Sequence, residues 1–415
     1  MLATCVPALS RSTLESSTET WRAATRLSAD YWVGALRRGA MPWDVATDAW
    51  RWSRTVTARR PPSWSSPHEI LLETPITRLR DFSQGSRDKV VPTIVLPPQA
   101  GNDYCIVDFS PAQSQMKVLR AAGLTRLYSV DWVGATSATR QTTIEDYLSD
   151  LDHVLEEVAP DGGKVNLIGD CQGGWLATIY AALHPERTNT LTIAGAPIDF
   201  HAGEAEIHRY VKLIGTTGDL SFYEQMVARH HGVMKGEYLL GGFIAMRPEN
   251  EITRQLALLK HLDNAEHVTR YAEFEDWFKY CQDIPGAFYL WIVEHLFRDN
   301  KLIKGELVVG GELVDLGRIE CPLFLLAGAK DHITPPDQVW GIADWVGTPA
   351  DKVQRELTAG GHLGLFMGRE ALRDHWPELM AGVHAASVPA PSPAQALRAA
   401  KRAAPTRPPV IRPGY

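Results

Sequence analysis

The stretch NLIGDCQGGWLAT, residues 166–178, decides the fold of this chain. It contains Gly169-Asp170-Cys171-Gln172-Gly173, which matches the G-x-nucleophile-x-G turn with a cysteine at its tip. The residues before the turn predict a strand, and those after it predict a helix. Such a turn holds its nucleophile in a strained backbone conformation, and small flanking residues keep the neighbouring backbones from colliding. The motif arises easily by chance, so a buried structural thiol is the competing interpretation of Cys171.

Strand-like and helix-like segments alternate on both sides of this turn. Apolar runs typical of buried strands lie at residues 90–98, 125–132, 164–170, 189–200, 321–331 and 353–362, and helical patterns lie at 114–122, 143–158 and 175–184. The alternation predicts an α/β fold in which helices cover both faces of a mostly parallel sheet. Residues 201–300 break the rhythm with an aromatic, mainly helical pattern. An insertion of this kind predicts a helical lid over the site.

Composition divides the chain into four parts. We expect an N-terminal helical segment at residues 1–88, a core at 89–200 and 301–385, the lid at 201–300, and a disordered basic tail rich in proline and alanine at 386–415. The N-terminal aromatic residues recur at helical spacing, which favours a packing helix over a partner-binding surface. For the tail, a solubilising role is favoured over binding to an anionic partner.

Length, charge and cysteine content limit the classes of function. The chain has 415 residues, of which 45% are hydrophobic, so it can bury a large core. Its formal net charge of −7 gives no reason to expect a nucleic-acid partner. The five cysteines are dispersed without a CxxC pair, which favours a reducing compartment over a disulfide framework or a metal site. We find no signal-peptide pattern and no bilayer-length apolar run, and we expect a cytoplasmic protein with no cofactor and no metal.

Two later segments supply candidate partners for Cys171. FLLAGAKDHITPP places Asp331 after an apolar strand, and ELTAGGHLGLF places His362 after the next strand. The order nucleophile, acid and histidine is that of the α/β-hydrolase fold. We predict that His362 takes the proton of Cys171 and that Asp331 orients the imidazolium. A turn carboxylate and a surface histidine are each common alternatives, but their joint occurrence at strand ends favours the triad.

Neighbours of the triad carry further expectations. We predict an oxyanion hole formed by the backbone amide of Gln172 and by the loop that follows the first core strand, where Gln99 and Ala100 lie. A carboxylate at Asp170 would raise the pKa of Cys171 and oppose a highly activated thiol. For His332, contact with the substrate, support of its loop, and simple exposure on the surface are the alternatives. A thiolate exchanges acyl groups easily with a thioester, which favours acyl transfer to a hydroxyl or ester cleavage.

Taken together, these motifs resemble the polyhydroxyalkanoate synthases, especially class III. The similar segments lie within about residues 91–367 and read LPPQAGNDYCIVDFSPAQS, VDWVG, GDCQGGWLATIYAALHP, NKLIKGELVVGGELVDL, KDHITPP and GGHLGLF. The resemblance implies that Cys171, Asp331 and His362 form the triad and that His332 is the histidine after the acid. It also points to Asn102 and Trp277 as substrate-binding residues, and Trp175, beside the nucleophile, is a further candidate. Trp175 stands where the family normally has threonine and is expected to alter the acyl pocket.

The resemblance implies a reaction and several partners. The family polymerises (R)-3-hydroxyacyl-CoA with release of coenzyme A, so the CoA thioester is a substrate and no cofactor is needed. A homodimer, a second synthase subunit and the surface of a polyhydroxyalkanoate granule are the implied partners. Cysteine-dependent intracellular polyhydroxybutyrate depolymerases, which use water as the acceptor, belong to the same broad group. Synthase-like polymerisation, hydrolysis of the polymer or its oligomers, and a non-catalytic granule-associated role therefore remain as three alternatives.

Overall fold

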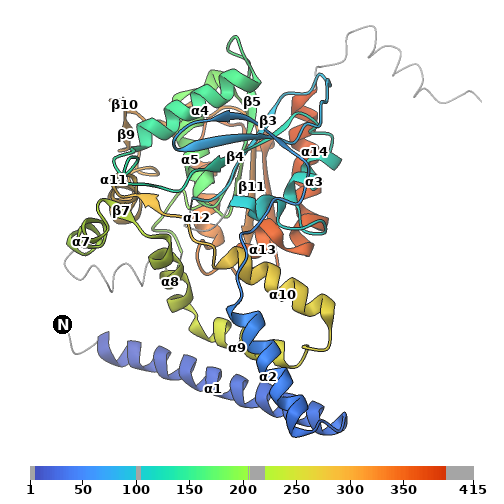
Figure 1. The fold of residues 1–415 in the computed structure, drawn as a ribbon. Coiled ribbons are helices and arrows are strands. Elements are labelled where there is room, and N and C mark those ends of the chain that lie inside the picture. The colour runs from blue at the N-terminus through green and yellow to red at the C-terminus, as the bar shows by residue number, and fades with distance from the viewer. Residues whose placement is uncertain (1–4, 100–103, 204, 206–219, 389–415) are drawn as a thin grey trace, which may run out of the picture.

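A sheet of eight strands lies at the centre of the computed structural model, which describes residues 5–99, 104–203, 205 and 220–388 (Figure 1). In spatial order the strands are β1 (Glu69–Glu73), β2 (Thr77–Asp81), β4 (Leu127–Trp132), β3 (Thr93–Leu96), β5 (Val165–Asp170), β6 (Thr188–Ala194), β11 (Leu323–Gly328) and β12 (Val353–Thr358). The six strands from β4 to β12 run parallel, and β1 and β2 add an antiparallel edge. The predicted α/β-hydrolase fold is confirmed.

Helices cover both faces of the sheet because consecutive side chains of a strand point to opposite sides. On β3, Ile94 and Leu96 join one buried cluster, and Val95 joins the other. The first cluster includes the apolar faces of α4 (Ile144–Val158) and α5 (Gln172–Leu183). The second includes α3 (Gln115–Ala121) and α14 (Trp376–Ser387). Because the strands from β4 to β12 run parallel, the loops that leave their carboxyl ends lie at one edge of the sheet.

The N-terminal segment differs from its expectation in two ways. It forms α1 (Cys5–Arg37) and α2 (Pro42–Thr57), but the strands β1 and β2 follow, so residues 69–81 belong to the sheet. Figure 1 shows α1 on the far side of α9 from the sheet, and α1 packs against α9. Its packing face is narrower than the aromatic pattern suggested, because Trp21 is 75% exposed and Trp32 is 53% exposed.

A helical region stands between β6 and β11, as the broken rhythm of residues 201–300 predicted. Its described helices are α7 (Ser221–Arg229), α8 (Gly236–Met246), α9 (Pro248–Leu259), α10 (Ala265–Phe278) and α11 (Gly286–Trp291), the last continued by a π-helical turn at Ile292–Arg298. The short strands β7 (Val233–Met234) and β8 (Ile284–Pro285) pair within this region. In Figure 1, α8, α9 and α10 lie between the sheet and the N-terminal helices.

The remaining elements complete the C-terminal half. They are the hairpin β9 (Val308–Val309) and β10 (Glu312–Leu313), then α12 (Pro336–Trp340) and α13 (His362–Met367). The helix α14 ends at Ser387, which is 2% exposed and accepts a hydrogen bond from Asn166 at 2.8 Å. The expected tail therefore begins inside a packed helix, and residues 389–415 lie outside the described part. Across the described residues, we find no helix with the length and apolarity that a membrane span requires.

Candidate active site

The turn at Cys171 joins the end of β5 directly to the start of α5. Cys171 is the single residue between them and has φ 50° and ψ −120°. A residue other than glycine rarely adopts this backbone conformation. It costs about 1–3 kcal/mol and persists only where the surrounding structure imposes it. Two hydrogen bonds hold the turn: the Cys171 N–H donates to the Ala194 carbonyl at 2.8 Å, and the Gly174 N–H donates to the Cys171 carbonyl at 2.9 Å.

Three glycines around Cys171 allow this close approach of backbones. A Cβ on Gly169 would lie 2.3 Å from the Gly174 Cα, and a Cβ on Gly173 would lie 1.8 Å from the Leu96 carbonyl oxygen. On Gly174 it would lie 2.3 Å from the Ala196 Cβ. Side chains at these positions are sterically excluded. The small residues of the motif are thus required by the contact between α5, β5 and the end of β3.

The two predicted partners of Cys171 meet at the carboxyl edge of the sheet. His362 is the first residue of α13 and follows β12, and Asp331 follows β11. The His362 Nδ1 lies 2.7 Å from the Asp331 Oδ2, and both residues are buried. The Asp331 Oδ1 accepts the backbone N–H groups of Ile333 and Thr334, each at 2.9 Å. These two bonds fix the carboxylate, which in turn fixes the imidazole ring.

The charge state of His362 depends on its two neighbours. Burial alone would lower the pKa of His362, because it disfavours the charged ring. The Asp331 carboxylate and the interaction with Cys171 act in the opposite direction and raise the pKa well above the ordinary value of an imidazole. His362 is therefore suited to hold a proton beside Cys171.

The residue before the nucleophile, Asp170, has a different environment. Its side chain is fully buried, and its Oδ1 accepts a hydrogen bond from the Gln115 Nε2 at 3.3 Å. Burial raises the pKa of Asp170 well above its ordinary value, although Gln115 and His362 act to lower it. Burial therefore favours the uncharged acid and opposes the negative charge beside Cys171 that the sequence suggested.

The structure describes part of the predicted oxyanion hole. Gln172 opens α5, and the first N–H groups of a helix have no acceptor within the helix. Gln99 is buried, and its side-chain Nε2 donates to the Tyr147 hydroxyl at 2.5 Å. Ala100 and Asn102 lie outside the described residues. The role of this loop as a second donor remains a prediction.

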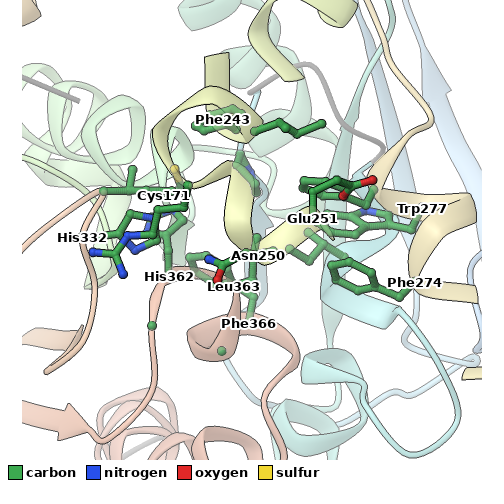
Figure 2. Close-up of a pocket in the computed structure, with 18 of the residues that line it drawn as sticks. Cys171, Phe243, Asn250, Glu251, Phe274, Trp277, His332, His362, Leu363 and Phe366 are labelled. Atoms are coloured by element: carbon green, nitrogen blue, oxygen red, sulfur yellow. The ribbon is translucent and has the colours of Figure 1, made fainter. Parts of the chain in front are cut away.

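Three cavities adjoin the turn formed by Cys171 and Gln172. The first, with a volume of about 310 Å³, contains Cys171, His332 and His362 on one side and residues of α8, α9 and α10 on the other (Figure 2). The second, of about 350 Å³, is lined mainly by apolar residues of α7, α8 and the α11 region. A third, of about 40 Å³, lies between Cys171 and Trp175. Phe243 of α8 lines all three, and no sequence motif marked it.

The predicted substrate-binding residues occupy distinct walls of these cavities. Trp175 is 2% exposed and packs against Phe288 and Trp291, so its indole narrows the smallest cavity. His332 lines the first cavity next to His362. Trp277 of α10 is also buried and faces the first cavity from the opposite wall, as Figure 2 shows.

A buried carboxylate, which sequence reasoning missed, supports this opposite wall. Glu275 of α10 is completely buried and pairs with Arg254 of α9 at 2.7 Å, with Lys279 at 2.7 Å and with Arg59 at 3.3 Å. Because Arg59 follows α2, the network joins the N-terminal segment to the helices that line the first cavity. A buried carboxylate of this kind needs its cationic partners to be tolerated.

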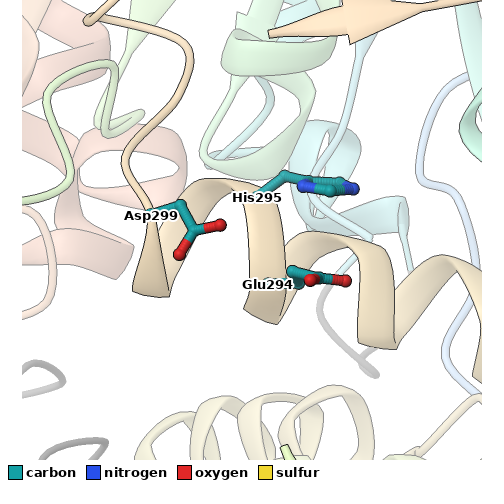
Figure 3. Close-up of side chains that lie close together, drawn as sticks. All are labelled: Glu294, His295 and Asp299. Atoms are coloured by element: carbon teal, nitrogen blue, oxygen red, sulfur yellow. The ribbon is translucent and has the colours of Figure 1, made fainter. Parts of the chain in front are cut away.

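Glu294, His295 and Asp299, which line none of these cavities, form a group of metal-binding residue types (Figure 3). Arg298 donates to Glu294 at 2.8 Å and to Asp299 at 2.7 Å, and the Lys301 Nζ lies 2.9 Å from the His295 Nδ1. These cations already pair with the side chains that a metal ion would need as ligands. We therefore assign no metal to this group.

Comparison with known proteins gives a consistent relationship. A family model described as "Protein of unknown function (DUF3141)" matches residues 76–397. The Poly(3-hydroxyalkanoate) polymerase subunit PhaC of Haloferax mediterranei is 28% identical over 318 residues, which cover 75% of this chain and 62% of that protein. The same-named subunit of Allochromatium vinosum is 26% identical over 296 residues, covering 70% and 79%. An alpha/beta fold family hydrolase from Bacillus anthracis aligns with a TM-score of 0.43 and 12% identity, covering 76% of this chain and 99% of that one.

The matches differ in how much of each protein they cover. The match reaches only about three fifths of the length of the Haloferax mediterranei polymerase, at 62%. The family model, in contrast, covers more than half of this chain and includes seven strands of the sheet, the cysteine turn and the helices that line the cavities. The chain therefore belongs to the family described as "Protein of unknown function (DUF3141)", with an α/β-hydrolase fold and a distant relationship to the poly(3-hydroxyalkanoate) polymerases.

Proposed function

We propose that this protein is an acyltransferase that forms an acyl-cysteine on Cys171 from 3-hydroxyacyl-CoA and extends a poly(3-hydroxyalkanoate) chain. The observation that carries the proposal is the cysteine at a strained strand–helix turn, beside a histidine that is hydrogen-bonded to a buried aspartate at 2.7 Å. Nucleophile, base and orienting acid stand in the order and context that covalent acyl transfer requires.

The first half-reaction charges the cysteine. The Cys171 Sγ attacks the thioester carbonyl while its proton is held by His362, and a C–S bond forms as the C–S bond to coenzyme A breaks. The proton on His362 then passes to the leaving thiolate, so free coenzyme A is released. Asp331 stabilises the imidazolium throughout, since it accepts from Nδ1 of the ring. One thioester replaces another, so the exchange is close to balanced in energy.

The second half-reaction transfers the acyl group to an alcohol. A 3-hydroxyl group, from a growing chain or a second substrate, gives its proton to His362 and attacks the acyl-cysteine carbonyl. An ester forms, and the proton returns to the Cys171 thiolate. The apolar cavity of about 350 Å³ suits the hydrocarbon part of such a chain. The names of the relatives support polymerisation as the outcome.

Hydrolysis of polyhydroxybutyrate or its oligomers is the second candidate, with water in place of the alcohol. The small cavity between Cys171 and Trp175 favours it, because about 40 Å³ is enough for an ordered water and Gln172, Thr334 and Gln338 also line the space. The acyl-cysteine is common to both reactions. The acceptor, and hence the wall around Trp175, decides between them.

The test uses the purified chain with 3-hydroxybutyryl-CoA, and with amorphous polyhydroxybutyrate in a parallel reaction. Release of coenzyme A is followed with a thiol reagent, and the acyl product is identified by mass spectrometry. Insoluble polymer supports the acyltransferase. Free 3-hydroxybutyrate from either substrate supports the hydrolase.

The Cys171→Ala variant is the control, because a small substitution at the turn tip leaves the surrounding glycine contacts intact. It should release no coenzyme A and no 3-hydroxybutyrate. Wild-type protein that is inactive on both substrates, together with granule binding that Cys171→Ala does not change, would overturn both proposals in favour of a non-catalytic granule protein.

A further inference from the structure

Two buried polar atoms behind the candidate nucleophile lack a partner among the described residues. They are the Asp170 Oδ2 and the Gln115 Oε1. Both are oxygen atoms, and both belong to side chains already joined by the hydrogen bond from the Gln115 Nε2 to the Asp170 Oδ1. A buried acceptor without a donor is expensive, so such a pair calls for a physical account.

One proton satisfies both atoms at once. If the Asp170 Oδ2 carries a hydrogen, it becomes a donor, and the unpartnered Gln115 Oε1 belongs to the side chain that already pairs with Asp170. A carboxylic acid and a primary amide then form a closed ring of two hydrogen bonds, with N–H to Oδ1 and O–H to Oε1. An ionised Asp170 has no hydrogen to donate and leaves the amide oxygen empty.

The surroundings favour the neutral acid. Asp170 and Gln115 are each completely buried, and an isolated charge in such a site is strongly disfavoured. The titratable groups nearby are Cys171, which follows in the chain, and His362, whose charge acts on Asp170 and opposes its protonation. His362 already pairs with Asp331, since its Nδ1 lies 2.7 Å from the Asp331 Oδ2.

We propose that Asp170 is a positioning residue that holds a proton and pairs reciprocally with Gln115, so that the turn places no negative charge behind the Cys171 thiolate. An ionised carboxyl beside Cys171 would oppose loss of the thiol proton. The neutral pair instead holds the end of β5 in place, directly before the strained residue Cys171. The proposal rests on Cys171 being the nucleophile of the proposed function.

The charge of Asp170 can be read through Cys171 without any substrate. The rate of alkylation of Cys171 by iodoacetamide is measured from pH 5 to pH 10, and the labelled peptide is quantified by mass spectrometry so that the other cysteines do not interfere. In Asp170→Asn, a neutral side chain of the same shape, the midpoint should stay within about 0.3 pH unit of the wild type. A midpoint lower by about one unit or more means that Asp170 was ionised, and overturns the proposal.

Two further measurements keep the result decisive if Asp170→Asn folds poorly. Asp170→Ala, also neutral, should give the same midpoint as the wild type. The infrared difference spectrum between the wild type and the variant should contain the C=O band of a protonated carboxyl at neutral pH, and Gln115→Leu should shift this band because it removes both hydrogen bonds. A carboxylate band in its place contradicts the proposal. Because alkylation needs no acyl substrate, failure of the proposed enzymatic activity leaves this test unaffected.

Discussion

Two strand ends of the sheet each place a buried aspartate near His362, and the two carboxyl groups have opposite surroundings. Asp331, after β11, meets the N–H groups of Ile333 and Thr334 and the imidazole of His362. Asp170, at the end of β5, meets one amide N–H of Gln115 at 3.3 Å. Exposure hardly distinguishes them, since the values are 5% and 0%. The number and charge of the donors therefore decide what each carboxyl does.

The difference shows how one residue type performs two tasks within a single site. A carboxylate that receives several donors can remain charged in the interior and stabilise a positive imidazolium. A carboxyl that faces an amide, with an unpartnered carbonyl opposite, is stable as the neutral acid. In the proposed mechanism, Cys171 lies between Asp331, which would act through His362, and the neutral Asp170, which would act through the backbone.

The largest effect is expected at the charged strand end. Asp331→Asn should lower the rate of coenzyme A release by about 10⁴-fold, since an amide cannot stabilise the imidazolium and favours the wrong tautomer of the ring. Asp315→Asn is the matched control, because Asp315 accepts the N–H of Gly317 in a similar turn, with no described contact to an imidazole. The rate is measured with 3-hydroxybutyryl-CoA. Equal losses in both variants would mean that Asp331 acts only as a turn residue.

The second prediction compares how much space the backbone leaves for a side chain near Cys171 and near His362. Gly173→Ala should destabilise the fold by about 4 kcal/mol or prevent folding, because its Cβ would lie 1.8 Å from the Leu96 carbonyl oxygen. Gly364→Ala, two residues after His362 on α13, meets nothing within 4 Å and should be neutral or stabilising. Urea denaturation of both variants gives the comparison. A mild loss at Gly173 would contradict the close approach of α5 to the end of β3.

The sequence predicted the strand ends better than it predicted their surroundings. Periodicity found β3 to β6, β11 and β12, and strand order brought Cys171, Asp331 and His362 to one edge, because parallel strands share their carboxyl side. It missed β1 and β2, two short strands at one side of the sheet with mixed polar composition and no buried run. It also missed Phe243, whose place at three cavities depends on how α8 docks.

The neutral state proposed for Asp170 could not be predicted from the sequence for a related reason. A sequence gives the neighbours along the chain, and those suggested a carboxylate beside a thiol. The partner that changes the conclusion, Gln115, lies 55 positions away and reaches Asp170 only when α3 packs on the sheet. Glu275 and Arg59, 216 positions apart, show the same limit. Side-chain environments that combine distant elements follow from packing, which composition and periodicity do not contain.

The third effect concerns the proton shared by His362 and Cys171. The raised pKa of His362 favours a positive charge on the ring beside Cys171, and this charge promotes attack by the sulfur. His362→Gln removes that charge, and the alkylation rate at pH 7 should fall about tenfold. Peptide-resolved labelling measures this, with Cys321 as an internal reference whose thiol pKa burial raises to about 11. An unchanged rate in His362→Gln would show that His362 does not affect the reactivity of Cys171.

The last effect is a change of stability with pH at Asp170. The pKa of Asp170 is raised on folding, so its contribution to the free energy of unfolding is fully present below about pH 4, the ordinary value of the carboxyl, and is lost as the pH rises toward the raised folded value. The slope from one such group is at most about 1.4 kcal/mol per pH unit. Asp170→Asn does not titrate, so its stability relative to the wild type should increase from pH 5 to pH 7.

Urea denaturation at pH 5, 6 and 7 measures this trend, and an exposed carboxyl supplies the control of opposite sign. Hydrogen bonds from Thr125 and Ser86 lower the pKa of Asp88, so its favourable contribution is present above its ordinary value and is lost only in acid. Asp88→Asn should therefore lose a little stability relative to the wild type, and the loss should not grow between pH 5 and pH 7. A constant difference for Asp170→Asn across the same range would show that Asp170 is ionised in the folded protein, and the two strand ends would then be alike in charge.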